Sequence, residues 1–121
     1  MAGTKETYSI KDKWIKFIHH LQNTICKGLE AADGQAVFVS DKWERAGGGG
    51  GDTRVIDKGT VFEKGGVNTS VVYGDVTDTM RKQLKIDGSK WFACGLSLVI
   101  HPLNPYVPTV HANWRYFELY D

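Results

Sequence analysis

The sequence contains no long run of apolar residues. No stretch approaches the about 20 consecutive apolar residues that a helix needs to cross a bilayer. The segment from Met1 to Lys13 is polar and charged, unlike a secretory signal. We therefore expect a protein that has no membrane span, is not exported and works in the cytoplasm.

Cysteine and excess charge are also scarce. The two cysteines, Cys26 and Cys94, are too few for a disulfide framework, so we expect small buried residues in a reducing compartment. Lys and Arg number 15 against 14 Asp and Glu, which gives a net charge of +1. No basic field exists to attract a phosphate backbone, so nucleic acid is excluded as an expected partner.

A chain of 121 residues suits one unit, and we expect residues 1–121 to form a single domain. Its first part predicts an amphipathic helix from Ser9 to about Glu30 that packs on a sheet, with Ser9 in a capping arrangement and Gly34 as the stop. The helix is indicated by apolar residues at steps of three and four, namely Ile10, Trp14, Phe17, Ile18, Leu21, Ile25 and Leu29.

After the helix the sequence changes to the composition and period of β-strands. β-Branched and aromatic residues with glycines at the borders predict strands over 36–45, 53–62, 66–76, 91–101 and 110–120. Residues 77–85 fit either a short helix or an irregular excursion. The expected fold class is therefore α+β.

A run of five glycines, Gly47 to Gly51, separates the first two predicted strands. It lacks the Gly-Lys-Ser/Thr ending of a nucleotide-binding P-loop, and strand rather than helix is expected after it. The run predicts either close approach of the backbone to a bulky ligand or a hinge.

The last two predicted strands flank a loop that holds all three prolines. If the loop folds near Tyr106, His101 lies opposite His111 and Ser97 lies opposite Arg115. Because side chains alternate along a strand, a register change of two residues would leave the same groups on one face. That face carries Ser97, His101, His111, Asn113 and Arg115.

Four interpretations of this polar face stay open on pattern alone. It fits the solvent-facing side of an antiparallel sheet, or a ligand site that offers a fixed cation, titratable imidazoles, a hydroxyl and an amide. His101 and His111 could instead hold a metal, although their spacing is not a metal signature. Ser97 with His111 would suggest acyl transfer, but the GxSxG motif is missing.

Longer motifs narrow these interpretations. They are Trp43-Glu44-Arg45 before the glycine run, Thr53-Arg54-Val55, Val61 to Asn68, and the segment from Val99 to Arg115, which contains His-Pro-Leu-Asn-Pro-Tyr-Val-Pro-Thr-Val-His-Ala-Asn. In this order the motifs closely resemble the oxygen-dependent coproporphyrinogen III oxidases, and the resemblance covers nearly everything from Ala36 onward.

The resemblance implies a fold, a reaction and a partner. The implied fold is a large, flat antiparallel sheet flanked by helices on both sides, in a homodimer. The implied reaction is the oxidative decarboxylation of two propionates of coproporphyrinogen III to vinyl groups, giving protoporphyrinogen IX in haem biosynthesis. Molecular oxygen is the expected co-substrate, carbon dioxide and hydrogen peroxide are released, and no organic cofactor is expected.

The resemblance also implies residue roles. His111 would be the catalytic proton donor, which suits an imidazole near neutral pH. Ser97 would contact the substrate, and the segment Asn113, Trp114 and Arg115 would bind it, with Arg115 suited to a bidentate grip on a carboxylate. The resemblance also makes His101 and His111 candidate ligands, because a divalent metal is sometimes assigned to these positions in the family.

The sequence departs from the family in two ways. Thr69 stands where an aromatic residue is frequent, and Trp114 where a smaller aliphatic residue is common, so either could alter the pocket. The family is also much longer, which indicates that this chain is its N-terminal part. The alternative function is therefore an inactive fragment that retains only part of a tetrapyrrole-binding site.

Overall fold

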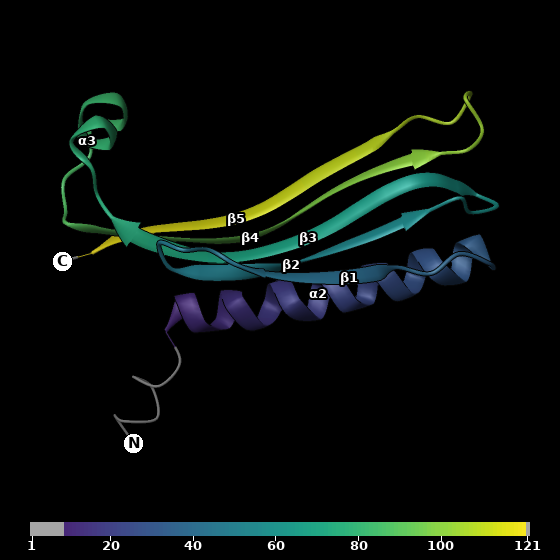
Figure 1. Cartoon of the computed structure of the whole chain (residues 1–121), viewed down its shortest axis with the longest axis horizontal. Coiled ribbons are helices and arrows are strands. Elements are labelled where there is room, and N and C mark those ends of the chain that lie inside the picture. The colour runs from purple at the N-terminus through teal and green to yellow at the C-terminus, as the bar shows by residue number, and fades with distance from the viewer. Residues whose placement is uncertain (1–8, 121) are drawn as a thin grey trace, which may run out of the picture.

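A computed structural model describes residues 9–120, which form one five-stranded antiparallel sheet and two helices (Figure 1). The strands follow one another across the sheet in the order β1-β2-β3-β4-β5. This arrangement confirms the α+β class. The elements are α2 (Ile10–Asp33), β1 (Val39–Glu44), β2 (Gly49–Asp57), β3 (Phe62–Asp75), α3 (Asp78–Leu84), β4 (Lys90–Pro102) and β5 (Val110–Tyr120).

Helix α2 confirms the predicted amphipathic helix and both of its caps. The Ser9 hydroxyl accepts a hydrogen bond from the backbone N–H of Asp12 at 3.2 Å, which satisfies a donor that has no partner within the helix. Gly34 ends the helix with a φ of 82°, and its N–H donates to the Glu30 carbonyl. The helix continues three residues beyond the expected Glu30. No helix within residues 9–120 is long and apolar enough to cross a membrane.

The hydrophobic core lies between α2 and one face of the sheet, as Figure 1 shows. Ile18 of α2 and Leu96 of β4 are completely buried there, and removal of such a side chain from water stabilises the fold by roughly 1.5–3 kcal/mol. Alternate residues of the central strands supply the sheet side of this core. They are Val67, Phe92, Cys94, Leu96, Leu98 and Ile100.

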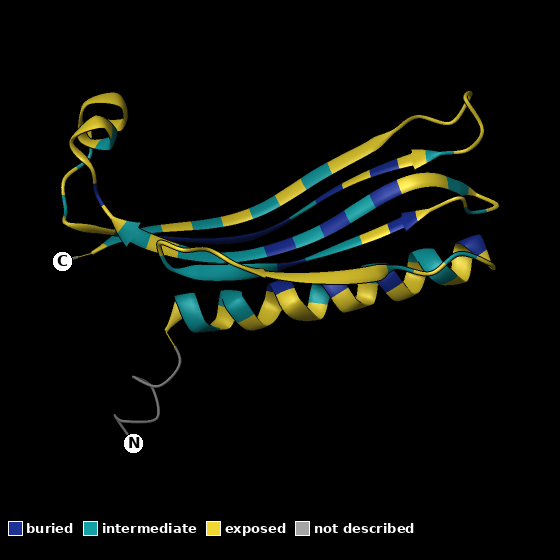
Figure 2. Cartoon of the chain, in the orientation of Figure 1, coloured by how far each residue is buried: buried dark blue, intermediate teal, exposed yellow. Residues whose placement is uncertain are grey.

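The opposite face of the sheet, here called the open face, is covered by no other described segment (Figure 1). Figure 2 shows that burial is concentrated in the central strands and on the sheet-facing side of α2. Exposed apolar side chains remain on the open face, among them Val55, Val99 and Phe117. Of the helices expected on both sides of the sheet, the described residues include one that packs on a face, α2 (Figure 1).

Several predicted strand limits were wrong. Gly49, Gly50 and Gly51 are the first residues of β2 rather than part of a hinge, and β2 ends at Asp57 rather than at Phe62. A turn with Lys58 at φ 53° separates β2 from β3, which begins at Phe62 instead of Gly66. β1 begins at Val39 rather than Ala36.

The ambiguous segment 77–85 contains the short helix α3. The Thr77 hydroxyl accepts from the N–H of Met80 at its start, and Lys85 in the left-handed conformation follows its end. The helix stands at one end of the sheet (Figure 1) and has no buried residue.

Asp33 fastens the end of α2 to the turn between β2 and β3. Its buried carboxylate accepts backbone hydrogen bonds from Ala36 at 3.0 Å, Thr60 at 3.1 Å, and Val61 and Phe62 at 3.0 Å each. The bonds from Ala36 and Phe62 are the main reason that the pKa of Asp33 lies well below its usual range, although burial opposes them.

We predict that Asp33→Asn lowers the melting temperature at neutral pH, because an amide cannot accept all of these hydrogen bonds. Since the folded pKa is lowered, the stabilisation by ionised Asp33 is present above the unfolded pKa and is lost as pH falls below about 4. The wild type should therefore lose more stability than the variant on acidification, as measured by thermal unfolding across pH. Asp41→Asn, which replaces an exposed carboxylate of β1, is the control. If both variants had the same melting temperature at each pH, the role of Asp33 would be contradicted.

Candidate functional site

The register of β4 and β5 differs by two residues from the expected one. Val99 pairs with His111, Ser97 with Asn113, and Gly95 with Arg115, so the expectation that His101 faces His111 was wrong. The turn is responsible, because the Asn104 side chain accepts from the N–H of Tyr106 at 2.9 Å. The Asn104 carbonyl also accepts from Val107, which moves the centre of the turn one residue towards the N-terminus.

The predicted sharing of a face is nevertheless confirmed. A shift of two residues does not change which side of the sheet a side chain occupies. The residues that alternate with Leu96, Leu98 and Ile100 therefore lie on the open face. They include Ser97, His101, His111, Asn113 and Arg115.

A row of polar residues crosses the centre of the open face. Each member pairs with the next across neighbouring strands, from β1 to β5: Asp41, Thr53, Asn68, Ser97 and Asn113. The Trp43 indole N–H donates to the Thr53 hydroxyl at 3.2 Å, so this aromatic ring also lies at the row. The row provides hydroxyl and amide groups at regular intervals from β2 to β5, and a carboxylate, that of Asp41, on β1.

Glycines next to the polar row keep part of the open face flat. A side chain at Gly51 would collide with the Trp43 ring, and a Cβ at Gly95 would collide with the Trp114 carbonyl on β5. Gly66 lies on the other side of the row, opposite Val99. A flat surface with few projecting side chains suits a broad, flat ligand rather than a compact one.

Four polar side chains of β4 and β5 on the open face are available to a ligand. In the described part of the chain, Ser97, His111, Asn113 and Arg115 make no side-chain hydrogen bond or ion pair. His111, Asn113 and Arg115 are exposed on β5. His101 has one contact, 3.3 Å between its Nδ1 and the Thr109 hydroxyl. An unpaired guanidinium beside a flat surface is suited to bind an anionic substituent of a ligand.

Trp114 is the one predicted binding residue that the structure does not bring to this face. It pairs with Leu96 and packs against the hydrophobic core on the helix side. Thr69, the other departure from the family pattern, is also buried on the helix side, where its hydroxyl donates to Gln22 at 3.3 Å. Alternation along a strand explains both placements, and neither ring nor hydroxyl adjoins the open face.

His101 and His111 do not complete a metal site within residues 9–120. Their positions are diagonal rather than opposite in the sheet register. No cluster of three or more His, Cys, Asp or Glu side chains occurs in this range. Two imidazoles fall short of the usual ligand set, so residues 9–120 do not form a complete site for a divalent ion by themselves.

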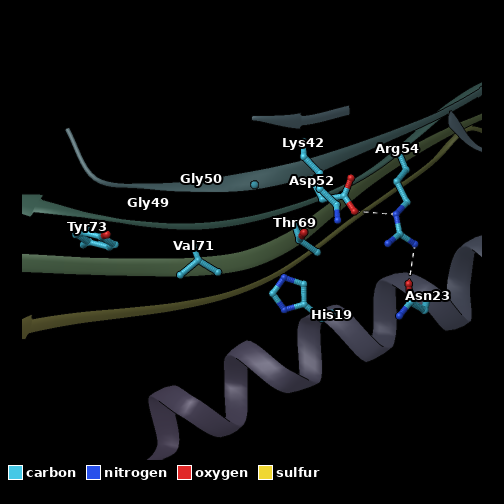
Figure 3. Close-up of a pocket in the computed structure, with 11 residues that line it drawn as sticks. His19, Asn23, Lys42, Gly49, Gly50, Asp52, Arg54, Thr69, Val71 and Tyr73 are labelled. Carbon is cyan, nitrogen blue, oxygen red and sulfur yellow. Dashed lines mark hydrogen bonds and ion pairs between the residues drawn. The ribbon is translucent and has the colours of Figure 1, made fainter. Parts of the chain in front are cut away.

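A cleft of about 470 Å³ lies on the other side of the sheet, between α2 and strands β1 to β3 (Figure 3). Three of its polar side chains are partnered with one another: Arg54 reaches the Asp52 carboxylate at 3.0 Å and the Asn23 amide oxygen at 2.7 Å. Burial opposes ionisation of Asp52, but hydrogen bonds from Ser40 and Arg54 outweigh it and lower its pKa. This network stabilises the contact of helix and sheet, and its charged members Arg54 and Asp52 satisfy each other.

The two thiols are not candidate nucleophiles. Both cysteines are free and buried, as predicted. Burial raises the pKa of Cys94 to about 11 and also raises that of Cys26, so both remain protonated near neutral pH.

Comparison with known proteins gives a consistent result. The model of the family described as coproporphyrinogen III oxidase matches residues 13–121. A relative from Prochlorococcus marinus is 51% identical over 104 residues, which cover 84% of this chain and 30% of the relative. One from Parasynechococcus marenigrum is 52% identical over 100 residues, covering 81% of this chain and 28% of the relative. Both are named oxygen-dependent coproporphyrinogen-III oxidase, and this chain spans about 30% of their length.

We predict that replacement by alanine changes the free energy of unfolding differently at two glycines of the open face. Gly95→Ala should lower the free energy of unfolding by about 1–3 kcal/mol, because its methyl group would collide with the backbone of β5. Gly66→Ala should leave stability unchanged or slightly increased, because the added Cβ would approach no atom closer than 3.7 Å. Urea unfolding measures both. Equal losses in the two variants would show that backbone approach does not shape this face.

Proposed function

We propose that this chain, which belongs to the coproporphyrinogen III oxidase family, forms the N-terminal part of the single domain of an oxygen-dependent coproporphyrinogen oxidase. The proposed fold is the family's flat sheet with further helices, which would cover the open face in the complete enzyme. The observation that carries the proposal is the open face itself, where a flat centre adjoins the unpaired Arg115 and His111.

The proposed reaction needs a proton donor. Each reacting propionate, together with one molecule of oxygen and one proton, becomes a vinyl group, one carbon dioxide and one hydrogen peroxide. The electron pair left by decarboxylation and loss of hydrogen reduces oxygen. His111 is exposed on the open face, and an imidazole exchanges protons near neutral pH, so we assign it the donor role.

Arg115, Asn113 and Ser97 would orient the substrate. The Arg115 guanidinium can bind a propionate with two parallel hydrogen bonds. Asn113 and Ser97 face each other across β5 and β4, so their amide and hydroxyl can contact the same region of the macrocycle. Because the Trp114 ring faces the core, we limit its role to positioning its two neighbours on β5.

The proposal includes a homodimer in the cytoplasm and no organic cofactor. Both outer strands of the described sheet, β1 and β5, have an edge without a strand partner, which supports further pairing or assembly. Two free buried cysteines are consistent with a reducing compartment.

A second candidate function is a tetrapyrrole-binding fragment without activity. It is favoured by one observation, that the chain spans about 30% of the length of its relatives. A single sheet face can contact only one side of a macrocycle, whereas catalysis needs a substrate that is fixed and shielded from water.

The proposed role of His111 is tested by inserting this chain in place of the matching segment of the Prochlorococcus marinus relative. His111→Ala should reduce oxygen-dependent turnover of coproporphyrinogen roughly 10²- to 10⁴-fold, because it removes the proton donor, while coproporphyrin III still binds. His20→Ala, an exposed histidine of α2, serves as the control and should retain activity. Near-normal turnover of the His111 variant would refute the assignment.

We further predict that residues 1–121 alone produce no protoporphyrinogen. The unpaired edges of β1 and β5 should also make the isolated chain self-associate. An oxygen-dependent assay of the purified chain, with its mass measured in solution, checks both expectations. Turnover by a monodisperse monomer would overturn them and exclude the inactive fragment as an interpretation.

A further inference from the structure

A small hollow of about 160 Å³ lies on the open face over strands β2, β3 and β4. Its apolar part is formed by Val55 and Val99, with the backbone of Gly66 between them in the register. Lys64 and His101 pair with each other at one end of it. We call the hollow formed by Val55, Lys64, Gly65, Gly66, Val99 and His101 the side-arm pocket.

Gly66 keeps the side-arm pocket open, although the packing of the described residues would leave room for a larger residue at this position. The nearest atom to a Cβ built at Gly66 is the Asn68 amide nitrogen at 3.7 Å, which is an ordinary contact distance. The neighbouring Gly65 differs, because a Cβ there would approach Ile100 to 2.9 Å. Packing thus explains Gly65, whereas the missing side chain at Gly66 leaves space that no described side chain fills.

Lys64 supplies an unpaired cation beside this space. It is exposed on β3, and Asp57 lies across from it on β2. The two ion pairs recorded for residues 9–120 join Arg54 to Asp52 and Arg81 to Asp78, so the Lys64 ammonium has no carboxylate within ion-pair distance there. The ammonium group therefore remains available to an anionic ligand.

We propose that the side-arm pocket binds one propionate of the tetrapyrrole, with Lys64 as the group that binds its carboxylate. This inference rests on the proposed function and adds a subsite to it. A propionate consists of two methylene groups and a terminal carboxylate. The methylenes match the apolar surface of Val55 and Val99, and the carboxylate matches the Lys64 ammonium.

The register distinguishes this propionate from the one assigned to Arg115. Lys64 pairs with His101, whereas Arg115 pairs with Gly95, six residues away along β4. At about 3.4 Å per residue this separation is roughly 20 Å, too far for one carboxylate to contact both cations. The side-arm pocket adjoins His111, because Val99 of the pocket pairs with His111. A propionate in the pocket would thus lie next to the proposed proton donor.

The test is a fluorescence titration of the 121-residue chain with coproporphyrin III, which carries the same four propionates. Lys64→Met should weaken binding about tenfold, because the carboxylate loses a charged partner, and Lys64→Arg should restore most of the affinity. Gly66→Val, which fills the hollow, should also weaken binding. Lys42→Met, at an exposed lysine on the helix side of β1, is the matched control and should bind like the wild type.

The outcomes separate this inference from the proposed function. If Arg115→Met weakens binding while Lys64→Met and Gly66→Val bind like the wild type, the side-arm pocket is refuted and the proposed function survives. If the wild type does not bind coproporphyrin III, the proposed site fails as well. Two separate carboxylates further predict that the losses from Lys64→Met and Arg115→Met multiply in the double variant. Circular dichroism checks that each variant is folded.

Discussion

The packing of α2 against one face of the sheet determines what every residue of the five strands can do. Because side chains alternate along a strand, burial of Leu96, Leu98 and Ile100 under the helix places Ser97, Val99 and His101 on the open face. The same alternation directs Trp114 into the core and its neighbours Asn113 and Arg115 outward. Stability is thus concentrated on one side, which leaves the other free to carry unpaired polar groups and exposed valines.

Local and periodic features of the fold could be predicted from the sequence. Apolar residues that recur every three or four positions, together with the two caps, predicted α2. Alternation of side chains predicted β5 with its observed limits, Val110 and Tyr120. The shared face of Ser97, His111 and Arg115 followed from alternation alone, which survives a shift of two residues. These features depend on neighbours in sequence, so they do not require knowledge of the tertiary structure.

Features that depend on distant contacts could not be predicted. Glycine disfavours strands, yet Gly49 to Gly51 belong to β2, where the Trp43 ring and the backbone of β3 leave no space for side chains. The register of β4 and β5 depended on a hydrogen bond of the Asn104 side chain within the loop. The polar row and the position of Lys64 opposite His101 required the order of all the strands. The face of the Trp114 ring, by contrast, follows from alternation along β5; only the family motif, which treats three consecutive residues as one segment, assigned Trp114 to substrate binding.

The chemistry of the open face has a simple arrangement. Hydroxyl and amide groups and glycines occupy its centre, with the carboxylate of Asp41 at the β1 edge, while the cations Lys64 and Arg115 lie towards different ends of it. A tetrapyrrole with carboxylates at its periphery has the matching distribution of apolar ring and negative charge. The helix-side cleft has the opposite character, since its charged residues Asp52 and Arg54 satisfy each other.

The most direct test of this account is an NMR titration of the methyl-labelled chain with coproporphyrin III. The aromatic ring of the porphyrin shifts the resonances of methyl groups over which it lies. We expect large shifts for Val55 and Val99 on the open face and little change for the buried Leu96 and Ile100. Shifts confined to Val71 in the helix-side cleft, or no shift at any methyl group, would contradict the claim that the open face binds the substrate.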